Sequence, residues 1–281
     1  MGHRNRDAGN GDGRGGGGSG RGSGVPPPTS RPTPTGPVLQ LLTAAPCPFA
    51  QRVVLALAAA GLPYTSVPIS LYGAGGKPAW FTALHPPGTV PVLLVYPSPV
   101  GESAVEAVAA GPGLGGKGRR ERAPPTVVAG SQQILTYLRT AHGAGAGADA
   151  ASTAAADGWR EWVDERLAPS GRAAVEGGGL YGGRRGGGGG GGGGGVPPAL
   201  AAELDWADAA LRSRGNGGGG GGPLVGAVWS AADSAVVPFV LRLDETIGLA
   251  SRWPGVAAYA AWARTVPAVR HAWVDGWWWW W

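Results

Sequence analysis

The stretch from Leu41 to Val54 constrains the fold more than any other part of this sequence. An apolar run over residues 38–42 predicts a short buried strand, and apolar residues recur at helical spacing after Pro48. Pro48 suits the first position of a helix, because its missing N–H would have no partner there. The pattern therefore predicts that Cys47, the one cysteine among 281 residues, lies where a strand ends and a helix begins.

This position predicts a reactive thiol. Free N–H groups and the positive end of the helix dipole favour the thiolate, and cysteines so placed have pKa values of about 3.5 to 7.5 instead of about 8.5. Ala50 stands where a C-x-x-C motif has its second cysteine, so Cys47 can form a disulfide only with a small thiol or another chain. A lone, buried and inert cysteine is the alternative interpretation.

The six residues from Cys47 to Arg52 read CPFAQR. This run resembles the N-terminal signature of the cysteine-type glutathione transferases, namely the lambda, dehydroascorbate-reductase and omega classes. The chloride intracellular channel proteins share the same signature. The resemblance implies an α/β N-terminal thioredoxin-like domain followed by an all-α C-terminal domain, the glutathione transferase architecture, with Cys47 as the catalytic residue.

The resemblance also implies residues that bind glutathione. Phe49 belongs to the signature itself, and Lys77, before a Pro-x-Trp-Phe turn, is expected to reach the glycyl end of glutathione. Val90 precedes Pro91, a proline that is cis in thioredoxin-like folds, and would offer its backbone N–H and C=O to the cysteinyl part. The alternative interpretations are a solvated surface lysine and a proline on an edge strand.

Two stretches compete for the site of the γ-glutamyl group, where the family has a strand, a Glu-Ser pair and a helix. Glu102 and Ser103 supply the pair but run into a charged, Gly/Ala-rich insertion. Residues 126–138 have the better strand and helix, and we favour them, with Gly130 in place of the glutamate and Ser131 as N-cap. A hydroxyl at a helix N-terminus suits a carboxylate, although Gly130 offers no carboxylate to the ligand's ammonium group. Ser131 could also serve as a cap alone.

Low-complexity stretches divide the chain into domains. We expect a thioredoxin-like domain over residues 37–142 and an all-helical domain over residues 152–275. Segments of this composition cannot repay the entropy of ordering, and four of them are expected to be disordered: residues 1–36, 97–125, 177–195 and 217–222. The first of these, with Arg and Ser but few acidic residues, is also compatible with an organelle transit peptide. We therefore expect a cytoplasmic protein and leave organelle targeting open.

Helical spacing of apolar residues recurs throughout the second domain. Its apolar stripes are Trp159, Val163 and Leu167; Leu200, Leu204 and Leu211; and Val236, Val240, Leu243 and Ile247. Ala257, Ala261 and Trp262 suit a last helix after Pro254. Ser230 with Asp233 three residues later is a variant of the capping box. Transferases of this superfamily carry a similar S-x-x-D at the start of a core helix, so we assign the pair a structural role.

Composition excludes several other functions. The net charge of +5 comes from the low-complexity segments, since residues 1–36 alone carry five Arg against two Asp, and it is weak evidence for nucleic-acid binding. The four histidines lack metal-ligand spacing, so no metal is expected. No apolar run approaches the roughly 18 residues that a membrane-spanning helix needs, so stable membrane insertion is not expected. A single cysteine suits a reducing compartment.

The leading interpretation is a glutathione-dependent thiol transferase, or an enzyme that reduces dehydroascorbate, acting through a mixed disulfide on Cys47. Glutathione would be the co-substrate, the second substrate a small electrophile or disulfide, and the protein a monomer or homodimer. The alternative is a non-enzymatic protein. It would be a transferase-like binding module, or a protein that associates with membranes as the chloride intracellular channel proteins do.

Overall fold

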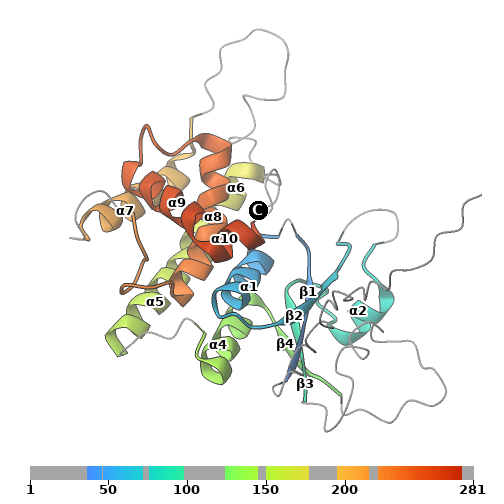
Figure 1. Ribbon diagram of the computed structural model, residues 1–281. Helices are drawn as coiled ribbons and strands as arrows, with labels where there is room; N and C mark the ends of the chain where they lie inside the picture. Colours follow the sequence, from blue (N-terminus) through green and yellow to red (C-terminus); the bar gives the residue numbers. More distant parts are fainter. Residues whose placement is uncertain are drawn as a thin grey trace, which may run out of the picture. The chain divides into compact units, whose positions relative to one another are not determined.

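A four-stranded mixed sheet forms the N-terminal part of the fold in this computed structural model (Figure 1). The strand order is β2-β1-β3-β4, with β2 parallel to β1, and with β3 antiparallel to both β1 and β4. The strands are β1 (Val38–Thr43), β2 (Tyr64–Pro68), β3 (Val92–Tyr96) and β4 (Thr126–Ala129). This sheet confirms the thioredoxin-like fold that the sequence predicted.

The structure describes residues 37–45, 47–71, 76–97, 124–144, 150–176, 195–214 and 221–273. Contacts divide the chain into two units, Met1–Thr33 and Pro34–Trp281, and all described residues belong to the second. The four segments expected to be disordered lie outside the described residues except at their edges. The expectations for them therefore stay predictions.

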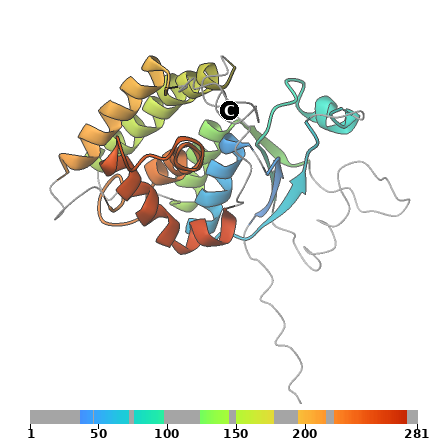
Figure 2. The same cartoon turned by 90° about the horizontal axis from the view of Figure 1, so that it is seen from above.

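Helices cover both faces of the sheet. Helices α1 (Pro48–Ala59) and α4 (Ser131–His142) lie on one face, and α2 (Ala79–Leu84) lies on the other, as the view from above also shows (Figure 2). Side chains alternate between faces along a strand. Leu41 in β1 accordingly packs with the α1 and α4 core, while the next residue, Leu42, packs with Phe81 of α2.

The rest of the described chain is helical. Its helices are α5 (Ala150–Trp162), α6 (Ala168–Glu176), α7 (Pro198–Arg212), α8 (Ala231–Ile247), α9 (Pro254–Thr265) and α10 (Pro267–Ala272). Every residue from Ala231 to Leu243 is buried, including the polar Asp233 and Arg242, so this helix lies inside the helical core. Helix α8 packs directly against α1 and α5. It therefore connects the helix that begins at Cys47 to the helical core.

The helical part corrects the sequence predictions in several details. Helix α5 begins at Ala150, slightly before the expected boundary. In α9, Ala257 and Trp262 pack against the helical core whereas Ala261 is exposed, and the fully buried face of this helix carries Tyr259. Helix α9, which the sequence predicted to be the last, is followed by α10. Pro267 occupies the first position of α10, where the missing N–H of proline is tolerated.

A turn of π-helix, Val163–Leu167, joins α5 to α6. The N–H of Ala168 bonds to the carbonyl of Val163, five residues back. Pro169 follows and has no N–H with which to continue the usual pattern. Apolar periodicity alone did not reveal this widened turn, which carries Asp164.

Candidate functional site

Cys47 is the N-cap of α1, as the sequence predicted. Its N–H donates to the carbonyl of Ala44 at 2.9 Å, and its carbonyl accepts from the N–H of Gln51 at 3.0 Å. Pro48 occupies the start of the helix. The thiol is half-buried, and its Sγ lies 3.9 Å from the carbonyl oxygen of Val90. The strand-turn-helix unit therefore places the thiol beside the loop that leads into β3.

The pKa of the Cys47 thiol differs from the sequence expectation. We expected the helix N-terminus to lower it, but burial raises the pKa above its ordinary value. The backbone N–H groups of Ala50 and Phe49, and the charges of Arg242 and Arg52, oppose that effect without overcoming it. The physical reason is that packing against the cluster that includes Leu42 of β1, Phe81 of α2 and Val92 of β3 removes water from the thiol, and this disfavours the charged form.

A cavity of about 500 Å³ opens beside the thiol. This volume is in the range of small-molecule sites. Four of the predicted site residues line it: Cys47, Phe49, Lys77 and Val90. The structure thus brings together side chains from the start of α1, the segment before α2 and the loop before β3. Apolar residues such as Ile69 and Leu71 line much of the remainder.

Two cations border this cavity, and no Asp or Glu among the described residues lines it. Lys77 is exposed, and its stem runs close over Gly88, where a Cβ would lie 2.9 Å from the lysine Cδ. Gly88 also has φ of +61°, which favours glycine. The second cation, Arg172, comes from α6. Sequence reasoning missed Arg172, because no motif connects this helix to Cys47.

The second group of predicted residues lies beside the cavity instead of lining it. The Val90–Pro91 peptide bond is cis, as the resemblance implied. The carbonyl of Pro91 accepts the N–H of Gly130 at 3.0 Å, which ties the cis bond to the start of α4. Gly130 is the N-cap of α4 and Ser131 its first helical residue, so the prediction of Ser131 as N-cap was wrong. The competing pair Glu102 and Ser103 lies outside the described residues.

Arg52, the last residue of the CPFAQR run, is fully buried. Its Nε donates to the carbonyl of Ala235 at 3.1 Å, and its Nη1 to the Ser131 hydroxyl at 3.4 Å. Nη1 also lies 2.5 Å from Oδ1 of Asp164. Burial lowers the pKa of Arg52, and the charge of Asp164 opposes that shift.

Two phenylalanine rings complete the surroundings of Arg52. The guanidinium carbon lies 5.1 Å from the ring centre of Phe49 and 4.7 Å from that of Phe239. The two rings meet edge to face at 5.3 Å. Arg52 therefore reaches both the cavity residue Phe49 and the Ser131 hydroxyl, a role that the sequence did not predict.

The capping box of α8 is confirmed. Ser230 is the N-cap, and both its N–H and its hydroxyl donate to Oδ2 of Asp233, at 2.8 and 2.7 Å. The other carboxylate oxygen accepts from the N–H of Leu224 and the hydroxyl of Tyr259, at 2.8 and 3.0 Å. Burial nevertheless raises the pKa of Asp233. Tyr259 was not predicted, since it lies on another helix.

Within the described residues, no three His, Cys, Asp or Glu side chains are grouped so as to hold a metal ion. None of the described helices is long and apolar enough to span a membrane.

Comparisons with known proteins agree with this geometry. Residues 46–141 match the family model described as glutathione S-transferase, N-terminal domain. The matched range includes Cys47, Lys77, the Val90–Pro91 bond and Ser131. The comparison with curated proteins gives no match.

Several solved structures are similar to this one. Glutathione transferases Omega 2C and Omega 1C from Trametes versicolor align with TM-scores of 0.61 and 0.60, each with 19% identity over 85% of this chain. The alignments cover 94% and 92% of those chains. A trimeric glutathione transferase from Leishmania, TDR1, aligns with a TM-score of 0.58 and 21% identity, over 84% of this chain and 46% of that one. These likenesses show the fold, which is a thioredoxin-like domain followed by a helical region, as in glutathione transferases.

Proposed function

We propose that this protein is a glutathione-dependent thiol transferase that works through a mixed disulfide on Cys47. The observation that carries the proposal is the position of the thiol. Sγ lies at the N-terminus of α1, lines a cavity of small-molecule size, and is 3.9 Å from the carbonyl of Val90. Backbone groups of Val90 can pair with the cysteinyl part of glutathione, which would bring a ligand sulfur next to Sγ.

Cationic groups around the cavity support an anionic ligand. Lys77, from the segment before α2, and Arg172, from α6, both line the cavity, and no described Asp or Glu lines it. Glutathione carries two carboxylates, so one cation can hold its glycyl end, as expected for Lys77. The other cation, Arg172, can then face the second substrate.

The proposed reaction balances as two thiol–disulfide exchanges. The Cys47 thiolate attacks the glutathione sulfur of a mixed disulfide between glutathione and a substrate thiol. The substrate leaves as a thiolate, takes a proton, and glutathione stays bound to Cys47 through a new S–S bond. The thiolate of a second glutathione attacks the bound glutathione sulfur, which releases glutathione disulfide and restores Cys47.

One experiment tests the central step. The full chain is incubated with glutathione disulfide, and intact mass spectrometry measures the fraction that carries one glutathione. We expect a single adduct that free glutathione removes, and steady turnover of the mixed disulfide of glutathione and cysteamine. Because the sequence holds one cysteine, Cys47→Ser is a complete control for adduct formation. An absent adduct on the folded wild-type protein would contradict the proposal.

A second candidate function is a non-enzymatic module that binds glutathione or a similar peptide. Two observations favour it: Gly130 has no carboxylate for the ammonium group of the ligand, and burial raises the pKa of the Cys47 thiol. Calorimetry with S-methylglutathione, which cannot form a disulfide, separates the two candidates. A binding module takes up this ligand and shows no turnover, whereas the transferase shows both.

A further inference from the structure

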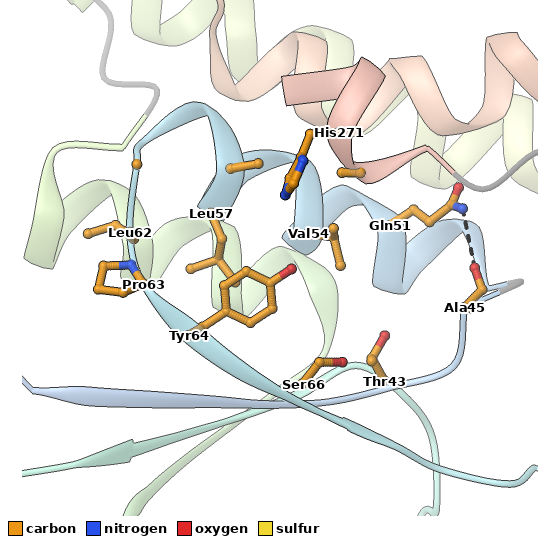
Figure 3. Close-up of a pocket in the computed structure, with 13 residues that line it drawn as sticks. Thr43, Ala45, Gln51, Val54, Leu57, Leu62, Pro63, Tyr64, Ser66 and His271 are labelled. Carbon is orange, nitrogen blue, oxygen red and sulfur yellow. Dashed lines mark hydrogen bonds between the residues drawn. The ribbon is translucent and has the colours of Figure 1, made fainter. Parts of the chain in front are cut away.

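A second cavity, of about 490 Å³, lies between strands β1 and β2, helix α1 and helix α10 (Figure 3). Its volume is in the range of small-molecule sites. Ala45 is the one described residue that lines both this cavity and the one beside Cys47. We refer to it below as the α1–α10 cavity.

Small side chains create the space in the α1–α10 cavity. Ala58 on α1 and Ser66 on β2 both line it and contribute little volume. Tyr64 lies two residues before Ser66, so both side chains are on the same face of the strand. His271 points from α10 past α1 in the direction of the strands (Figure 3). The cavity is therefore lined by α1, α10 and the two strands β1 and β2.

The strand side of the α1–α10 cavity carries three hydroxyl groups, from Thr43, Tyr64 and Ser66 (Figure 3). None of the three side-chain hydroxyls makes a hydrogen bond to another described residue. Burial raises the pKa of Tyr64, so its hydroxyl stays protonated and can donate. Three hydroxyls without protein partners can serve a ligand's polar group.

The opposite side of the cavity is apolar. Val54 and Leu57 of α1 face the hydroxyls, and Leu62 and Pro63 close one end (Figure 3). At the other end Gln51 is held by its Nε2, which donates to the carbonyl of Ala45 at 3.2 Å. No Asp, Glu, Lys or Arg among the described residues lines the cavity. Apart from the imidazole of His271, the lining residues offer no side chain that could pair with an ion, whereas a neutral molecule incurs no desolvation penalty for a charge.

We propose that the α1–α10 cavity is a binding site for a small, neutral aromatic molecule that carries a hydroxyl group. The aromatic ring lies against the half-buried Val54 and Leu62, and the ligand hydroxyl bonds to the hydroxyls of Tyr64 and Ser66. This site is separate from the Cys47 cavity. Its ligand needs neither the thiol nor the two cations that border that cavity.

The first test measures binding of 2-naphthol to the full-length Cys47→Ser protein by titration calorimetry at pH 7. The Cys47→Ser background makes the result independent of any thiol chemistry. We expect saturable binding of one molecule per chain. Naphthalene-2-sulfonate, which has the same ring but a negative charge, should bind at least tenfold more weakly. Absence of saturable naphthol binding, or equal binding of the sulfonate, would overturn the proposal.

The second test locates the site with a matched pair of variants in α1. Ala58→Trp places an indole in the cavity, whereas Ala59→Trp adds the same group at the neighbouring exposed residue, which does not line it. Ala58→Trp should weaken naphthol binding at least tenfold, and Ala59→Trp should leave it unchanged. Equal binding by the two folded variants would contradict the assignment.

A third pair of variants keeps the test decisive if Ala58→Trp does not fold. Ser66 is exposed on the edge strand β2, so Ser66→Leu is tolerated more easily than a change in α1. It fills the cavity and removes one hydroxyl, and should also weaken binding at least tenfold. Tyr64→Phe keeps the ring and removes the donor, and should weaken binding at least threefold. Wild-type affinity in both variants would overturn the proposal.

Discussion

The Nη1 atom of Arg52 lies 2.5 Å from Oδ1 of Asp164, and this ion pair joins the helix that begins at Cys47 to the π-helical turn of the helical region. The Arg52 side chain is fully buried, whereas the Asp164 side chain is 21% exposed. Helix α1 is therefore tied to the helical region by a buried charge, besides its apolar packing on α8.

The first prediction concerns this ion pair. Arg52→Met removes a buried guanidinium. The carboxylate of Asp164 then lacks the cation that pairs with it, and the carbonyl of Ala235 lacks its hydrogen-bond donor from Arg52. Breaking one side of a buried pair destabilises a protein by about 3–5 kcal/mol. Urea unfolding, followed by circular dichroism, should show a loss of this size.

Arg166 supplies the matched control for Arg52. It pairs with Glu203 at 2.9 Å, but its side chain is half exposed. Exposed pairs contribute about 0–1 kcal/mol, because water and salt screen them. Arg166→Met should therefore reduce the free energy of unfolding by less than about 1 kcal/mol. Losses of equal size in the two variants would contradict the interpretation of Arg52.

The second prediction concerns the pH dependence of the thiol. Burial raises the pKa of Cys47, so the thiolate forms only as the pH rises above the ordinary value of about 8.5. The rate of alkylation by iodoacetamide should therefore keep rising beyond pH 8.5, and thiol transfer should rise with it. The urea-unfolded chain should titrate at the ordinary value. A folded midpoint below the unfolded one would show that the helix N-terminus outweighs burial.

The third prediction compares two glycines. Gly130 has φ of +88° and ψ of 140°, a conformation that residues with a Cβ rarely adopt, and a Cβ there would lie 2.5 Å from Oε1 of Gln133. The flexible Gln133 side chain can move, but the backbone strain remains. Gly130→Ala should therefore destabilise the protein by about 1–3 kcal/mol.

Gly158 is the control for Gly130. It lies inside α5 with open space around its Cβ position. Gly158→Ala should stabilise the protein by about 0.5–1 kcal/mol, because alanine is the better helix former. Chemical denaturation of both variants measures the difference. A stabilising Gly130→Ala would refute the strained geometry at the start of α4.

The fourth prediction concerns the buried carboxylate of Asp233. The Tyr259 hydroxyl donates to its Oδ1 at 3.0 Å. Tyr259→Phe leaves that oxygen with one donor fewer in a site buried from solvent, which should reduce stability by about 1–3 kcal/mol. Tyr137→Phe, on the half-buried face of α4, is the control and should change stability by less than about 0.5 kcal/mol. Equal melting midpoints for the two variants would argue against this role of Tyr259.

The fifth prediction concerns the cations beside the cavity. Lys77→Met and Arg172→Met each remove a positive charge from the cavity border and should raise KM for glutathione or for its mixed-disulfide substrate at least threefold. The Cys47 thiol is unchanged, so kcat should change less than KM. Arg270→Met, at an exposed position of α10, removes the same charge away from this cavity and should leave KM unchanged. A shift of KM in all three variants would indicate a general effect of charge.

Local sequence patterns determined much of the fold and the position of the thiol. The placement of Cys47 at a helix start needed only a strand pattern, Pro48 and helical periodicity, which act within a few residues. The same holds for the Ser230 and Asp233 capping box, whose hydrogen bonds span three residues. Both features depend on hydrogen bonds and apolar spacing between residues close in the sequence. Tertiary packing did not alter them, so the sequence alone was enough to predict them.

Tertiary structure decided how these elements act together. The partners of Arg52 come from α4, α8 and the π-helical turn, and Arg172 reaches the Cys47 cavity from α6. These contacts join residues far apart in the sequence, so no local sequence pattern predicts them. The direction of the Cys47 pKa was also decided there. The helix N-terminus is visible in the sequence and favours the thiolate, but the loss of water around the thiol depends on every element packed against it, and that loss is the larger effect.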